Sequence, residues 1–252
     1  IGLEAAAVTV GLGLETTLVE AAPRILGRVA VAETAHYFER LHRDRGVTLL
    51  CGVGVSRLEP GADGTRVAQA ELTDGRVLPA DLVIVGVGVA PETALAEAAG
   101  LAIDDGIAVD GFGATSDPSI YAAGDCASFP HEGRRMRLES VQNAIDQAAL
   151  AARAMLGAAE AAYAPVPWFW SDQYDVKLQI AGLCQGADDV VMRQGAREGA
   201  LSVWSFAGGA LRSVDAMNDP KAYMIGKRWL EAGVSPDPAR LADPESDLRA
   251  LA

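Results

Sequence analysis

Apolar residues recur at helical spacing in some segments and as short runs in others, which predicts alternating helices and strands. Helices are predicted at residues 2–12 and 31–45, and strands at 16–20, 47–50, 67–72, 76–78 and 82–85. Gly46 is a natural helix end, and Asp74-Gly75 is a strong turn signal between the two strands of a hairpin. The run at 82–85 is apolar throughout, as expected of a strand buried on both faces of a sheet. This alternation predicts an α/β fold.

The pattern changes twice in the rest of the chain. Between residues 113 and 166 we expect one short strand at 120–123 and one long helix that begins near Ser140. The apolar stripe predicted for this helix consists of Val141, Ala144, Ile145, Ala148, Ala152 and Met155. After a Pro-containing linker at 164–167, strands are predicted at 176–180, 190–192, 201–206 and 211–216, and a helix at 221–231. Residues 167–252 therefore predict a C-terminal α+β domain with an antiparallel sheet.

Charge and cysteine content disfavour several classes of function. The formal net charge of −13 disfavours binding to nucleic-acid backbones and to anionic membranes. The sequence contains no run of about eighteen apolar residues, so no membrane-spanning helix is predicted. Cys51, Cys126 and Cys184 form no C-x-x-C pair, which argues against a zinc site or a dithiol redox centre. Isolated thiols suit a reducing cytoplasm, where we expect the protein to be located.

The first residues have the pattern of a nucleotide-binding loop. Ile1-Gly2-Leu3-Glu4 corresponds to the last glycine of G-x-G-x-x-G and the first helical turn, whose N–H groups can approach a pyrophosphate. Glu20 lies 18 residues after Gly2, near the spacing of about 20 expected for an acid that binds the ribose 2′-OH. A carboxylate there repels a 2′-phosphate, which favours NAD over NADP. The alternative is an ordinary helix packed on a strand that ends in Glu.

A second candidate site lies at residues 115–125. There a short strand is followed by Gly124-Asp125, so that the glycine allows close backbone approach and the carboxylate can bind sugar-like hydroxyls. The same residues are compatible with a buried strand that ends in a tight turn, and composition does not choose between these two interpretations.

Four segments in the right order carry a resemblance to a known family. IGLEAAA resembles the NAD-domain helix of two-dinucleotide flavoprotein reductases, LVIVGVGVAP their strand and glycine turn beside the nicotinamide, and TSDPSIYAAGD their second FAD-binding motif. PWFWSDQYDVKLQIAG resembles the C-terminal domain of the FAD-dependent ferredoxin reductases of bacterial oxygenase systems, such as the putidaredoxin, rubredoxin and biphenyl-dioxygenase ferredoxin reductases. The resemblance implies a Rossmann-like NAD-binding domain at 1–112, part of an FAD-binding domain at 113–166 and a C-terminal reductase domain at 167–252.

The resemblance also implies roles for residues of the NAD-binding part. Gly2 matches the last NAD-loop glycine, and Glu4 matches an acid that hydrogen-bonds near the nicotinamide. Glu20 matches the acid that binds the adenosine ribose. Gly86 and Gly88 match the turn that lets the nicotinamide approach the flavin.

Three more residues match positions around FAD. Asp125 matches the carboxylate that holds the ribityl chain, and Val141 matches a backbone donor to the flavin pyrimidine edge. Trp170 matches an aromatic residue next to the isoalloxazine, although a plain core tryptophan is the alternative. The helix beginning near Val141 would direct its positive end at the flavin and stabilise its reduced form by on the order of 1 kcal/mol. No acid–base residue is implied, because the cofactors carry the chemistry.

The resemblance implies electron transfer from NADH through FAD to a ferredoxin-type iron–sulfur protein. Since ferredoxins are usually acidic, docking would need a local basic patch, and Arg134, Arg135 and Arg137 form the densest basic cluster. A solvated loop is the alternative for this cluster.

The family's N-terminal FAD domain and the strand that opens its NAD domain have no counterpart in this sequence. We therefore expect an N-terminally truncated enzyme whose 252 residues alone do not hold FAD tightly. The competing interpretations are another pyridine nucleotide-dependent flavin oxidoreductase, of the NADH oxidase or nitrite reductase type, and an inactive nucleotide-binding fragment. The sequence leaves the oligomeric state open.

Overall fold

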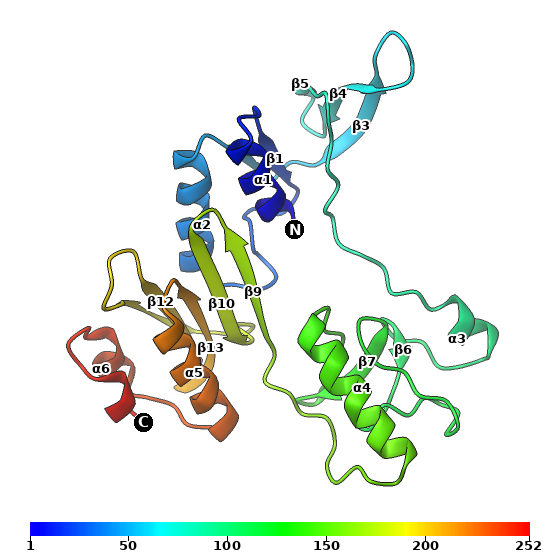
Figure 1. Ribbon diagram of the computed structural model, residues 1–252, viewed down its shortest axis with the longest axis vertical. Helices are drawn as coiled ribbons and strands as arrows, with labels where there is room; N and C mark the ends of the chain where they lie inside the picture. Colours follow the sequence, from blue (N-terminus) through cyan, green and yellow to red (C-terminus); the bar gives the residue numbers. More distant parts are fainter. The chain divides into compact units, whose positions relative to one another are not determined.

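The computed structural model describes residues 1–252, and the chain divides into two units. The first unit consists of Ile1–Val87 and Trp170–Ala252, and the second of Gly88–Phe169. Figure 1 labels most of their helices and strands. No helix of the protein has the length and apolar character needed to cross a membrane.

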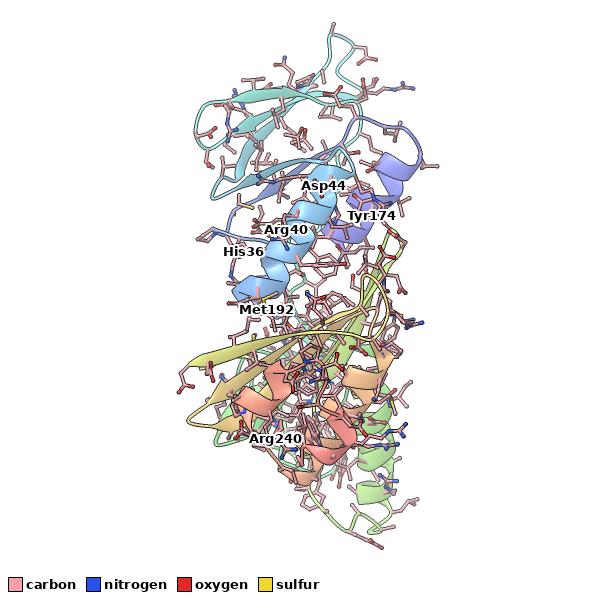
Figure 2. All side chains as sticks on the ribbon, turned by 90° about the vertical axis from the view of Figure 1, so that its left-hand side faces the viewer. His36, Arg40, Asp44, Tyr174, Met192 and Arg240 are labelled. Atoms are coloured by element: carbon pink, nitrogen blue, oxygen red, sulfur yellow. The ribbon has the colours of Figure 1, made fainter.

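The first unit opens with two helix–strand pairs, as the sequence predicts. They are α1 (Gly2–Gly11), β1 (Thr17–Glu20), α2 (Ala32–Asp44) and β2 (Thr48–Cys51). The two strands pair in parallel, with Leu18 opposite Leu49. Helix α2 buries one face, which includes Phe38 and His42. His36, Arg40 and Asp44, spaced four residues apart, lie along its exposed face (Figure 2).

An antiparallel sheet follows, formed by β3 (Val55–Pro60), β4 (Val67–Leu72) and β5 (Val77–Pro79). The predicted hairpin is confirmed in β4 and β5, whereas β3 was not predicted. The predicted buried strand at 82–85 is wrong, because these residues form no strand and Leu82 and Val85 are 68% and 69% exposed. An apolar run becomes a strand only beside a hydrogen-bonding neighbour, and the parallel sheet here contains β1 and β2 alone.

The C-terminal part of the first unit is a five-stranded antiparallel sheet with the order β11-β12-β13-β10-β9. Its strands are β9 (Trp168–Gln173), β10 (Val176–Gly182), β11 (Asp189–Gln194), β12 (Leu201–Ala207) and β13 (Ala210–Met217). This confirms the predicted sheet, in which a turn at Gly208-Gly209 joins β12 and β13, while β9 was not predicted.

Helix α5 (Pro220–Ala232) packs against β10 and β13, as Figure 1 shows. Gly226 makes this close packing possible, because a Cβ there would lie 2.6 Å from Val214 Cγ1 and 2.8 Å from Trp204 Cζ3. Trp204 is fully buried and lies 5.5 Å from the Trp229 ring. The chain ends with α6 (Pro238–Ala242) and the short 3-10 helix η1 (Leu248–Ala250).

The second unit contains little regular structure around its longest helix. Its elements are α3 (Ala94–Ala98), β6 (Ile107–Ala108), β7 (Ala127–His131), β8 (Arg134–Met136) and α4 (Val141–Met155). Its core gathers around Phe129, Val109 and Ala127. The strand predicted at 120–123 is wrong, since only Tyr121 forms an isolated bridge, with Ala114.

Helix α4 begins where the sequence predicts but buries a different face. Val141, Ile145 and Met155, from the predicted apolar stripe, are 65%, 57% and 60% exposed. The buried residues of the helix are Asn143, Gln147, Leu150 and Ala151. The buried amides have hydrogen-bonding partners inside the unit, so polar residues take positions that hydrophobic periodicity assigns to solvent.

Candidate functional site

The start of α1 brings together three of the predicted site residues. Gly2 is the first residue of the helix, and Glu4 lies in its first turn. Gly86 lies beside them, because a Cβ built there would be 3.5 Å from the Gly2 nitrogen and 3.8 Å from Ile1 Cγ2. The first N–H groups of a helix have no intrahelical partner. Gly86 thus lies within contact distance of the end of α1 where a ligand could accept hydrogen bonds.

Glu20 ends β1, as predicted. Its Oε1 accepts a hydrogen bond from the Ala22 N–H at 2.8 Å, which fixes the carboxylate at the carboxyl end of the parallel strand. In open α/β sheets, ligands bind outside the carboxyl ends of the strands. The position and charge of Glu20 fit an acceptor for ribose hydroxyls.

Trp170 and Ser171 are adjacent on β9, so their side chains point to opposite faces of the strand. Trp170 is 46% exposed, which does not agree with a plain core tryptophan. The Ser171 hydroxyl donates to Glu4 Oε1 at 2.8 Å, although 167 residues separate the two in sequence. Ser171 was not predicted as a site residue, since no local pattern in the sequence marks it.

In the second unit, Gly124 and Asp125 form the turn expected of the second motif. Gly124 has a φ of 84°, which favours glycine, and a Cβ there would lie 3.4 Å from the Ala144 Cβ of α4. The Gly124 N–H donates to Gln147 Oε1 at 2.7 Å. Arg137 Nη1 donates to the Asp125 carbonyl oxygen at 3.0 Å. Gln147 and Arg137 therefore hold the turn and leave the exposed Asp125 side chain toward solvent.

The N-terminus of α4 lies in the same unit as this turn. The Ser140 side chain caps the helix by accepting the Asn143 N–H at 3.2 Å. No acidic residue lies in the first turn, so the positive end of the helix dipole is not neutralised there. Val141 is the first residue of the helix and is 65% exposed. This end of α4 is suited to an anionic or hydrogen-bond-accepting group.

The predicted residues thus fall into two groups. Gly2, Glu4, Glu20, Gly86 and Trp170 lie in the first unit, and Gly88, Asp125 and Val141 lie in the second. Gly88 has a φ of 102°, a conformation that favours glycine.

The basic cluster predicted for docking is mostly engaged in internal contacts. Arg135 Nη2 donates to the carbonyl oxygens of Val109 and Ser128 at 2.7 and 2.5 Å. The Arg137 side chain is only 11% exposed and also bonds Glu139 at 2.6 Å. The three arginines therefore do not form one free basic patch.

Models of two known protein families match successive parts of the chain. A model of the pyridine nucleotide-disulphide oxidoreductase family matches residues 1–148, and a model of the reductase C-terminal domain matches residues 168–252. The chain belongs to the pyridine nucleotide-disulphide oxidoreductase family. Membership in this family confirms the Rossmann-like α/β fold with a C-terminal antiparallel domain that the sequence predicts.

Individual members of the family resemble the chain along its whole length. A 5,5′-dehydrodivanillate O-demethylase ferredoxin reductase subunit of Sphingobium sp. is 42% identical, over 100% of this chain and 61% of the relative. Putidaredoxin reductase of Pseudomonas putida is 37% identical, over 100% of this chain and 60% of the relative. This chain therefore spans about 60% of the length of these relatives.

Solved structures of ferredoxin reductases also resemble the chain along nearly its whole length. A ferredoxin reductase from Rhodopseudomonas palustris has a TM-score of 0.94 at 43% identity, covering 99% of this chain and 62% of that one. The covalent putidaredoxin reductase–putidaredoxin complex gives a TM-score of 0.94 at 37% identity, covering 100% and 60%. The resemblance to ferredoxin reductases noted in the sequence is confirmed.

Proposed function

We propose that the protein is a flavoprotein reductase that moves electrons from NADH through FAD to a ferredoxin-type iron–sulfur protein of an oxygenase system. The observation that carries this proposal is similarity to ferredoxin reductases along the whole chain, including the C-terminal domain. NADH oxidase and nitrite reductase types were alternatives on the same scaffold, but the reductase C-terminal match favours the ferredoxin reductases. We propose a cytoplasmic location, since none of the three cysteines is paired in a disulfide.

Two features of the structure fit the implied cofactors. Gly86 lies against the first residues of α1, and Glu20 lies where an acid would bind the ribose of NAD. The turn at Gly124-Asp125 and the N-terminus of α4, whose first turn has no acidic residue, both lie in the second unit and fit two parts of an FAD site. The division into an NAD-binding domain at 1–112, an FAD-domain segment at 113–166 and a reductase domain at 167–252 belongs to this proposal.

Bound FAD would supply the chemistry that accepts an electron pair from NADH and releases electrons singly. The residues of this chain would bind and orient the two cofactors. We assign Glu20 to the ribose of NAD and Glu4 to the nicotinamide end, with Gly2, Gly86 and Gly88 allowing close backbone approach. Asp125 would bind the ribityl hydroxyls, Val141 would donate its N–H to the flavin pyrimidine edge, and Trp170 would lie next to the ring system.

Reduction of an iron–sulfur protein tests the proposal. The protein, expressed at the full length of its gene, would be mixed anaerobically with NADH and putidaredoxin, with ferricyanide as a second acceptor and NADPH as the comparison nucleotide. We expect NADH-dependent reduction of both acceptors and a clear preference for NADH. If NADH reduces neither putidaredoxin nor ferricyanide, the proposed function is contradicted.

A further inference from the structure

A continuous series of side-chain hydrogen bonds connects Glu4 to residues far away in the sequence. Ser171 Oγ lies 2.8 Å from Glu4 Oε1, and Gln173 Nε2 lies 3.0 Å from Ser171 Oγ. Gln173 Oε1 lies 2.8 Å from His42 Nε2, and the Tyr174 hydroxyl lies 3.0 Å from His42 Nδ1. The series joins α1, α2 and β9, and all of it lies within the first unit.

The donors of this series all point the same way. Gln173 donates its amide N–H to Ser171, so its carbonyl oxygen accepts from His42, whose Nε2 then carries the proton. His42 Nδ1 is left to accept from the Tyr174 hydroxyl. Burial lowers the pKa of His42, which agrees with the neutral ring that this arrangement needs. Each donor thus leads toward the Glu4 carboxylate, and hydrogen bonds in such a chain polarise one another.

The distant end of the series is held rigidly. His42 is fully buried and Gln173 is 1% exposed. Tyr174 has a φ of 56°, a strained conformation for a bulky residue, and such strain persists only where surrounding contacts determine it. Figure 2 labels Tyr174 near the last turn of α2. The Arg45 guanidinium covers its ring at 5.0 Å, so Tyr174 is fixed from both sides.

The near end is less buried. The Glu4 side chain is 40% exposed and belongs to the first turn of α1. A carboxylate has about four lone-pair sites, so the bond from Ser171 leaves room for donors of a ligand. A half-exposed glutamate on a helix surface would otherwise sample several rotamers, and binding would have to restrict them.

We propose that Ser171, Gln173 and His42 are positioning residues, which hold the Glu4 carboxylate ready for the nicotinamide end of NADH. This inference rests on the proposed function, because it takes Glu4 as the acid near the nicotinamide. None of the three residues needs to contact the nucleotide. They act through Glu4, and the C-terminal sheet thereby contributes to binding in the NAD-binding part.

Nucleotide binding separates this role from a structural one. The dissociation constants of NADH and ADP-ribose, which lacks the nicotinamide, would be measured by isothermal titration calorimetry on the protein at the full length of its gene. The test variants are Ser171→Ala and Gln173→Met, and Ser171→Thr keeps the hydroxyl. Ser205→Ala is the matched control, because it removes another buried hydroxyl contact of the same sheet, 2.7 Å from Ser213 Oγ, with no link to Glu4.

We expect Ser171→Ala to weaken NADH binding about tenfold, which corresponds to about 1.4 kcal/mol and lies near the range for hydrogen bonds to charged groups. Gln173→Met should weaken it severalfold, whereas Ser171→Thr and Ser205→Ala should bind like wild type. ADP-ribose affinity should stay unchanged in all four variants. NMR of the imidazole nitrogens should show the Nε2–H tautomer of His42.

The possible failures are distinguishable. If wild type binds NADH but Ser171→Ala binds it equally well, or loses ADP-ribose affinity to the same extent, the positioning role is refuted while the proposed function stands. Unchanged NADH affinity in Gln173→Met, or the Nδ1–H tautomer of His42, would overturn the part of the series beyond Ser171. Absence of NADH binding by wild type would overturn both the proposed function and this inference.

Discussion

Asp215 on β13 gives the sharpest stability prediction, because its carboxylate is fully buried in the first unit. Its Oδ2 accepts from the Thr34 hydroxyl at 2.7 Å, and its Oδ1 has no hydrogen-bond partner. Burial raises the pKa of Asp215 to about 7, against the opposing effect of the Thr34 hydroxyl. The perturbation is Asp215→Asn, which keeps the shape and the acceptor for Thr34 but carries no charge.

The sign follows from proton binding. The ordinary pKa of an aspartate is 3.8, so between pH 3.8 and about pH 7 the folded protein holds a proton that the unfolded chain has released. Raising the pH through this window therefore favours unfolding. The difference between the two pKa values corresponds to about 4 kcal/mol, fully developed above pH 7. Asp215→Asn is thus expected to gain stability relative to wild type by up to about 4 kcal/mol as the pH rises.

Urea denaturation of both proteins at a series of pH values from about 4 to 8 measures this difference, and the titration of all other groups cancels in it. Asp189→Asn, which changes an exposed residue of the same sheet, is the control and should track wild type at every pH. A stability difference between Asp215→Asn and wild type that is independent of pH would refute the reasoning.

Three further changes test other parts of the account. Gly226→Ala should destabilise the protein by about 1–3 kcal/mol in chemical denaturation, because its Cβ would lie 2.6 Å from Val214 Cγ1. Gly11→Ala, whose Cβ meets nothing within 4 Å, is its control. Glu20→Arg should shift the ratio of kcat/KM for NADH and NADPH at least about tenfold toward NADPH, because it replaces repulsion of the 2′-phosphate by attraction. Arg193→Met should speed proteolysis of the C-terminal segment, because the buried guanidinium donates to four carbonyl oxygens of residues 241–246.

For each of these three variants, one result would contradict the expectation. Equal stability of the two alanine variants would mean that the α5–sheet contact is looser than the structure shows. An unchanged nucleotide preference in Glu20→Arg would remove Glu20 from the ribose site. Proteolysis of Arg193→Met at the wild-type rate would show that Arg193 does not anchor the C-terminal segment.

The C-terminal sheet and α2 could be predicted from the sequence because each is encoded locally, by alternation in β10 or by a face of apolar residues in α2. The segment at 82–85 could not, since an apolar run becomes a strand only beside a neighbour that periodicity does not reveal. The buried face of α4 was missed for a related reason. Gln147 is buried because it accepts the Gly124 N–H, and hydrophobic periodicity places a glutamine in solvent.

In the candidate site, too, residues in local motifs were predicted and residues that depend on distant contacts were not. Gly2, Glu20 and Gly124 stand in short motifs whose spacing has a physical reason, so they were found in the sequence. Ser171 and His42 were missed, because their connection to Glu4 depends on contacts across more than a hundred residues.

The visible absorbance spectrum of the purified protein, at the full length of its gene and under anaerobic conditions, tests the central claim most directly. We expect a bound flavin band that bleaches when NADH is added and returns when an oxidised iron–sulfur protein is then added. A protein that carries no flavin and takes up none from added FAD, or a flavin band that NADH leaves unchanged, would contradict it.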